Sequence, residues 1–255
     1  MASSGNENDK PQVRIEEVRI EERVELIVQL GTDLSASSIP GAIDVGALPG
    51  SDGEHRLQDK YGRTTHALAF YKHQVLDHLN PAMRAFLARQ EMMFVGTADA
   101  KGHADSAFRC GHAGFVKVLD ESTIAYPEYR GNGVMATLGN ISENPHVGLL
   151  FIDFGDQIGL HINGGAKIVE NHEFLEFLKD HPAEQAILGD AVLKDIIESD
   201  GGHLERWVMV EVAEAYVQCS KHIPPMQRLD HDIKWGEEHP HLKGGDYFGT
   251  AHSQK

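Results

Sequence analysis

The sequence contains only two cysteines and no long apolar run. Cys110 and Cys219 lie far apart and form no CxxC pair, which argues against a disulfide framework and a structural zinc site. The best apolar run, Val147 to Ile152, is far shorter than the roughly 20 residues that a membrane-spanning helix needs. The polar start, residues 1–12, lacks the apolar segment of a secretory signal. We therefore expect a cytoplasmic protein with no membrane span.

Positive charge is also scarce. The chain has 23 Lys and Arg against 39 Asp and Glu, which gives a formal net charge of −16 with its 16 His neutral. Such an acidic surface repels phosphate backbones and anionic lipids, so the composition predicts no nucleic-acid partner and no membrane-surface partner. Hydrophobic residues at 41% and charged residues at 24% are close to globular averages, and they predict a folded core.

The chain is expected to have three parts. Residues 1–63 form an N-terminal extension, in which the segment 31–62 is rich in Gly, Ser, Asp and Pro and is typical of a linker or an ordered surface arm. Residues 64–228 form the main domain. Residues 229–255 form a C-terminal tail that carries His231, His239 and His241.

Short strands separated by turn residues dominate the main domain. Apolar alternation predicts strands over 92–98, 104–109, 115–119, 123–126, 147–154, 158–169 and 207–218. The first four are expected to form an antiparallel meander. Helices are predicted from Pro81, near Val134, and over 172–180 and 183–199. The alternation continues through Asn163-Gly164, which favours a bulge within one strand over a hairpin turn. Together these elements predict a small antiparallel β-barrel with flanking helices, mainly β in class.

The most informative segment runs from Tyr126 to Gly133, between a strand and a predicted helix. Its glycines let the backbone turn with N–H groups exposed, and the start of the next helix presents further unpaired N–H groups. Arg130 adds a forked cation. This combination is typical of a phosphate-binding turn, although an ordinary turn with a surface arginine has the same local sequence.

Five segments in register resemble the flavin-binding split barrels, the pyridoxamine 5′-phosphate oxidase-like proteins, and in particular their flavin and deazaflavin oxidoreductase branch. They cover about half of the chain. The matching segments are Phe94–Asp99 with Gly102, Gly114–Asp120, Pro127–Asn132, Asn140–Phe151 and Ile162–Ala166. The resemblance implies a split β-barrel of Greek-key-like antiparallel strands, with FMN or FAD bound at a homodimer interface.

The resemblance also implies which residues contact the cofactor. The ring-contacting strand corresponds to residues Asp105, Ser106, Ala107, Phe108 and Arg109, and the second ring-lining strand to Ile124 to Tyr126. The matching turn begins at Pro127, and its phosphate-binding part contains Tyr129, Arg130, Gly131 and Asn132. Gln157 and Lys221 are weaker candidates from a loop and from the C-terminal segment. The family's Ser-Arg-Lys turn lacks its lysine here, because Gly131 and Asn132 follow Arg130, and this departure puts the identity of the bound nucleotide in doubt. No counterpart of the oxidases' substrate-phosphate residues is present, which argues against vitamin B6 oxidation.

Two functions follow from this resemblance. The first is a flavin-dependent oxidoreductase that acts on a small-molecule redox substrate, with deazaflavin as an alternative co-substrate. In such an enzyme, Arg109 would stabilise the anionic reduced flavin. Cys110 would be either a redox-active thiol or a packed core thiol. The second is a non-enzymatic protein that binds or sequesters flavin or haem. Haem needs an axial ligand, and four histidines fall in or beside predicted strands: His103, His112, His146 and His161. No catalytic residue and no metal ligand can be named from the sequence.

Overall fold

The computed structural model describes residues 48–198, 204–229, 247, 248 and 250. The chain divides into two compact units, Met1–Leu48 and Pro49–Lys255, and all that follows concerns the second. Most of the expected N-terminal extension and the three tail histidines lie outside the described residues. Within the described ranges, no helix is both long and apolar enough to cross a membrane.

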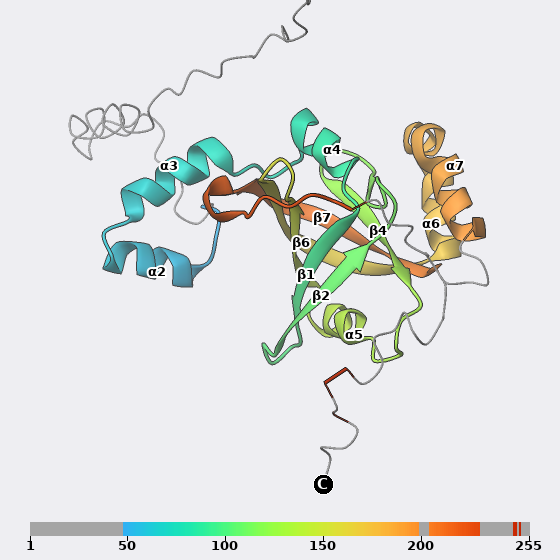
Figure 1. Ribbon diagram of the computed structural model, residues 1–255, viewed down its shortest axis with the longest axis horizontal. Coiled ribbons are helices and arrows are strands. Elements are labelled where there is room, and N and C mark those ends of the chain that lie inside the picture. Colours follow the sequence, from blue (N-terminus) through green and yellow to red (C-terminus); the bar gives the residue numbers. More distant parts are fainter. Residues whose placement is uncertain (1–47, 199–203, 230–246, 249, 251–255) are drawn as a thin grey trace, which may run out of the picture. The chain divides into compact units, whose positions relative to one another are not determined.

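Seven antiparallel strands form one sheet in the order β2-β1-β5-β6-β7-β4-β3 (Figure 1). Their bounds are β1 Met92–Ala98, β2 Ala104–Cys110, β3 Lys117–Val118, β4 Thr123–Tyr129, β5 His146–Asp153, β6 Ile158–Glu170 and β7 Leu204–Gln218. The two edge strands, β2 and β3, do not pair with one another, so the sheet is not closed by backbone hydrogen bonds. The predicted mainly β fold with flanking helices is confirmed, as an open split barrel.

The predicted meander is wrong. β1 pairs with β2 and β3 pairs with β4, as the turn residues between them indicate, but β2 and β3 lie at opposite edges of the sheet. The connection between these two hairpins buries Phe115 and Val116 in the core, and β4 then pairs with β7. The turn residues therefore define each hairpin, whereas the burial of the connecting segment accounts for the position of the β3–β4 hairpin in the sheet.

The predicted bulge within β6 is confirmed. The strand runs without interruption from Ile158 to Glu170, and its pairing with β7 shifts register between Asn163 and Gly164. Gly164 fits there because a Cβ atom at this position would lie 2.0 Å from the carbonyl oxygen of Glu211 on β7. The Asn-Gly pair thus permits close approach of two backbones instead of reversing the chain.

Six α-helices accompany the sheet in the described ranges: α2 Asp52–Lys60, α3 Thr64–Gln74, α4 Pro81–Leu87, α5 Ala136–Glu143, α6 Asn171–Asp180 and α7 Pro182–Glu198. A short 3₁₀ turn, Ser220–His222, follows β7. The predicted start of α4 is confirmed, since Asn80 Oδ1 accepts a hydrogen bond of 2.9 Å from Met83 N and Pro81 occupies the first turn.

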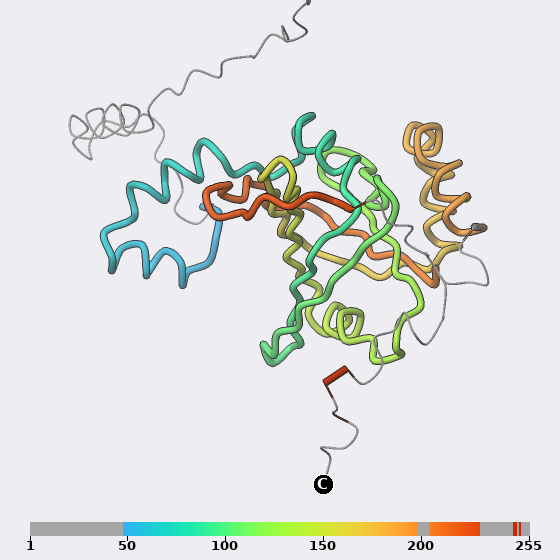
Figure 2. The backbone as a smooth tube through the Cα atoms, viewed as in Figure 1, coloured from blue at the N-terminus to red at the C-terminus, as the bar shows by residue number. Residues whose placement is uncertain are grey.

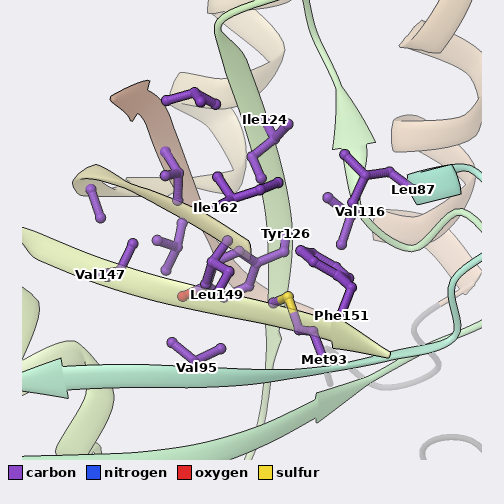
Figure 3. Packing of buried hydrophobic residues seen from close by; sticks show 14 of the residues in the cluster. Leu87, Met93, Val95, Val116, Ile124, Tyr126, Val147, Leu149, Phe151 and Ile162 are labelled. Carbon is purple, nitrogen blue, oxygen red and sulfur yellow. The ribbon is translucent and has the colours of Figure 1, made fainter. Parts of the chain in front are cut away.

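Alternate residues of the central strands enter two separate cores. Ile124, Tyr126 and Val210 belong to the larger core inside the curved sheet, which Figure 3 shows from close by. The residues next to them along the strands, Ala125 and Met209, belong to a second core, which the sheet shares with α6 and α7. β4 and β7 are therefore buried on both faces, and this gives the sheet a rigid centre.

The helix α5 lies alongside β1, β2 and β6 (Figure 2). Thr137, Leu138 and Ile141 form its buried face. Because α5 is anchored in this way, its first turn is held beside β2 and the end of β4, where the predicted phosphate turn lies.

Candidate cofactor cavity

A cavity of about 640 Å³ lies between β2, the end of β4, the following turn and the start of α5. This volume is in the usual range for small-molecule sites. The cavity brings together two segments that the sequence suggested separately, the ring-contacting strand and the phosphate turn. The predicted residues that line it are Asp105, Ser106, Ala107, Phe108, Arg109, Tyr129, Arg130, Gly131 and Asn132.

The turn before α5 exposes backbone N–H groups for a specific local reason. Asn132 Oδ1 accepts a hydrogen bond of 3.0 Å from Val134 N, which tightens the turn. Gly133 has φ +83° and Met135 has φ 56°, so the chain passes twice through the left-handed region before the helix begins at Ala136. No side chain caps α5, and its first-turn N–H groups therefore remain available to an anion at its positive end.

Arg109 lies in the wall of the cavity and is held by three hydrogen bonds. Its Nε donates to Glu128 Oε1 at 2.7 Å, its Nη2 to Thr137 Oγ1 at 3.1 Å, and its Nη1 to the carbonyl oxygen of Phe108 at 3.1 Å. Thr137 belongs to the first turn of α5, so Arg109 joins β2, β4 and the helix start. These bonds use three of the five guanidinium N–H groups, and they fix the orientation of the other two.

Glu128 is the buried carboxylate of the cavity, with 9% of its side chain exposed. Burial raises the pKa of Glu128. The hydrogen bond from Arg109 and the positive charges of Arg109 and Arg206 lower this pKa, but their effect is smaller than that of burial. The antiparallel register pairs Glu128 on β4 with Arg206 on β7. The carboxylate therefore has an arginine on either side.

Two further arginines line the cavity. Arg130 Nε lies 3.3 Å from Glu205 Oε1. Arg206 Nη2 lies 3.8 Å from the other oxygen of Glu205, and its buried Nε forms an ion pair with Glu170 Oε1 at 3.6 Å. Among the described residues, this Nε has no partner within hydrogen-bond distance. The lining of the cavity therefore carries three arginines beside three carboxylates, Asp105, Glu128 and Glu205.

Cys110 also lines the cavity. Burial raises the pKa of its thiol, and this effect outweighs the opposing charge of Arg109. The thiol is therefore protonated at neutral pH, which favours the packed-thiol interpretation over a reactive thiolate.

The remaining predicted residues do not line this cavity. Tyr126 and Pro127 are buried in β4, and the Tyr126 hydroxyl has no hydrogen-bond partner within the described structure. Gln157 adopts φ 53° in the turn between β5 and β6, and its Nε2 donates to the carbonyl oxygen of Ile223 at 2.7 Å. Lys221 lies in the adjoining 3₁₀ turn. Gln157 therefore contacts the segment that follows β7, and this contact lies outside the cavity.

The strand histidines show no arrangement that would hold a metal. His103 contacts Asp99, His146 contacts Asn144, and His161 stacks on Tyr216 with 4.7 Å between ring centroids. Within the described ranges, no group of three or more His, Cys, Asp or Glu side chains could hold a metal ion, and no histidine is among the residues that line the cavity.

Several residues of the site carry no distinctive signal in the sequence. Glu128 lies within the segment from Tyr126 to Gly133, and Thr137 lies just after it. The residues around them in the sequence do not distinguish either one from a surface residue. Arg206 and Glu205 lie about 75 residues further on, and only the pairing of β4 with β7 brings them to the cavity.

Comparison with known proteins agrees with this architecture. A family model described as "Pyridoxamine 5'-phosphate oxidase" matches residues 79–219, which is more than half of the chain. No curated protein matches.

Solved structures similar to this chain include an F420 reductase (17% identity, TM-score 0.34), the haem storage protein HutZ from Vibrio cholerae (16%, 0.36) and a FAD-binding protein from Mesorhizobium loti (10%, 0.35). The matches cover 53%, 55% and 56% of this chain and 94%, 93% and 94% of the other chains, respectively.

Proposed function

Since the chain belongs to the pyridoxamine 5′-phosphate oxidase family, we propose that it is a flavin-dependent oxidoreductase that binds FMN or FAD in the cavity beside Arg109. The observation that carries this proposal is the meeting of β2, the Arg130 turn and the uncapped start of α5 in one cavity. The turn and α5 would hold the phosphate, and β2 would contact the ring. Bound flavin would supply hydride or electron transfer, while the protein orients the ring and shields it from water.

The fit of an anionic cofactor is supported by the charges of the cavity. Arg109, Arg130 and Arg206 line it from β2, the turn and β7, and they balance the three carboxylates of the same lining. In a chain with a net charge of −16, these groups oppose the general repulsion of phosphate. Nothing in the cavity selects FMN over FAD, and the substrate would be a small redox-active molecule.

We expect the purified protein to bind FMN at micromolar concentration or better, with absorption maxima near about 375 and 450 nm that bleach with dithionite. FMN should bind at least about tenfold more tightly than riboflavin, because a charge-assisted hydrogen bond to the phosphate contributes about 1.5–3 kcal/mol. Titration by fluorescence measures both affinities, and the mass of the released cofactor distinguishes FMN from FAD. Absence of flavin binding would overturn the proposal.

The alternative is a protein that binds flavin or haem without turnover. This alternative is favoured by the state of Glu128, the buried carboxylate of the cavity. Glu128 is already bonded to Arg109, so it is not free to act as an acid or a base. Such a protein would bind oxidised flavin but would not accelerate its reduction by nicotinamide or deazaflavin donors above the rate of free flavin. A sharp absorption band near about 400 nm would instead indicate haem.

We also propose that the protein is a homodimer. The strand register places Phe108, Phe94, Leu150, His161 and Tyr216 in one row across the sheet, on the face opposite the larger core. Phe94 and Phe108 are 37% and 51% exposed, and their ring centroids are 5.7 Å apart. Gly96 and Gly148 make the adjoining row flat. An apolar face of this kind is typical of an interface with a second copy.

Light scattering should give a mass of twice 28.1 kDa at micromolar concentration. Phe94→Asp should convert the protein to a monomer, because a dimer would bury the new carboxylate without a partner. Ile187→Asp is the matched control: this side chain is 79% exposed on α7, away from the aromatic row, and the change should leave the mass as it is. A monomeric wild-type protein would contradict the proposal.

A further inference from the structure

Glu128 occupies an unusual position for a carboxylate. It is buried on β4, the strand next to the edge strand β3, and it nevertheless belongs to the lining of the cavity. Three titratable or charged groups face it: Arg109 from β2, Arg206 from β7 and Tyr126 from its own strand. A second carboxylate of the cavity, Glu205, is more exposed and pairs with Arg130 and Arg206 instead.

Glu128 and any anion at the start of α5 would share the same guanidinium group. Arg109 Nε donates to Glu128 at 2.7 Å, while Arg109 Nη2 reaches Thr137 in the first turn of α5 at 3.1 Å. An anion that accepts bonds from the first-turn N–H groups would therefore lie close to the guanidinium group that also binds Glu128. The distance across one guanidinium group is short enough for two negative charges to repel in a site that excludes water.

An added negative charge disfavours the ionised form of a neighbouring carboxylate. The negative charge of the ligand would therefore act on Glu128 in the same direction as burial, which already raises the pKa of its carboxyl group. The positive charges of Arg109 and Arg206 act in the opposite direction. The protonated form still leaves Oε1 able to accept the bond from Arg109 Nε, so the guanidinium keeps its position in either state.

We infer that Glu128 is a positioning residue that takes up a proton when an anionic ligand binds beside Arg109. The inference rests on the proposed function in so far as that ligand is a flavin nucleotide. Ionised Glu128 holds Arg109 in the empty cavity, and protonated Glu128 leaves the whole charge of Arg109 to the ligand. The ligand class is one with a phosphate or similar anion, and binding should weaken as the pH rises.

The test is calorimetric titration with FMN at pH 6, 7 and 8, each in two buffers with different ionisation enthalpies. The wild-type protein should take up more protons per FMN than Glu128→Gln, by up to about one proton, because glutamine keeps the acceptor for Arg109 but cannot titrate. The affinity ratio of the variant to the wild type should rise with pH by up to about tenfold per unit. The phosphate group of FMN also takes up protons, but equally with both proteins. The difference in proton count between wild type and variant therefore excludes this contribution.

Two controls separate the possible outcomes. Glu176→Gln alters an exposed carboxylate on α6, outside the cavity, and should keep the wild-type proton count. Riboflavin, which has no phosphate, should show no difference in proton count between wild type and Glu128→Gln. Equal proton counts for wild type and Glu128→Gln with FMN would overturn the inference. If FMN does not bind, the flavin proposal fails, and the same titration with pyrophosphate then tests the proton uptake by itself.

Discussion

Replacing Arg109 with Ala is expected to lower the free energy of unfolding by about 3–5 kcal/mol at pH 8, because it leaves the buried carboxylate of Glu128 without its hydrogen-bonded partner. Without that bond, burial raises the pKa of Glu128 further above its value in the unfolded chain. A group whose pKa is raised in the folded state favours folding at low pH, and this contribution is lost as the pH increases. The loss of stability should therefore be smaller at pH 5.5 than at pH 8.

Urea unfolding at the two pH values measures this difference. Arg130→Ala is the matched control: Arg130 lines the same cavity, but its side chain is 47% exposed and paired at 3.3 Å, so its removal should cost less than about 1 kcal/mol at either pH. The double variant Arg109→Ala, Glu128→Gln should recover part of the stability at pH 8, since no buried carboxylate is then left without its partner. An effect of Arg109→Ala that is the same at both pH values would contradict the role assigned to Glu128.

Gly164→Ala is expected to destabilise the protein by about 3 kcal/mol or more, and to prevent folding at 37 °C. The new Cβ atom would lie 2.0 Å from the carbonyl oxygen and 2.9 Å from the carbonyl carbon of Glu211, and both are backbone atoms of the paired strand. The two longest strands, β6 and β7, would have to separate at the bulge. No rotamer change can relieve a clash with backbone.

The neighbouring glycine supplies the control for this prediction. A Cβ atom at Gly165 would meet only the carbonyl oxygen of Pro145, at 3.9 Å, which is an ordinary contact. Gly165→Ala should therefore leave the melting temperature within a few degrees of wild type. Thermal unfolding followed by circular dichroism compares the two variants, and a Gly164→Ala protein as stable as Gly165→Ala would show that the bulge tolerates a side chain.

The sequence by itself determined the elements whose signals are local. Alternating apolar residues predict β1, β5 and β6 to within about a residue, and Asn80-Pro81 predicts the start of α4, because strand periodicity and helix capping depend on neighbouring residues only. The continued alternation through Asn163-Gly164 predicts the bulge for the same reason. Residues 105–109 and 129–132 were suggested by resemblance, and the structure places them around one cavity.

Only the tertiary structure decided which distant segments meet. The hairpin of β3 and β4 joins the sheet through the pairing of β4 with β7, not beside β2. This placing buries Phe115 and Val116, and the free energy of that burial is a property of the whole core. The same pairing brings Arg206 opposite Glu128, and the docking of α5 brings Thr137 to Arg109. A carboxylate becomes buried, paired and able to respond to a ligand only through these long-range contacts, which leave no periodic trace in the sequence.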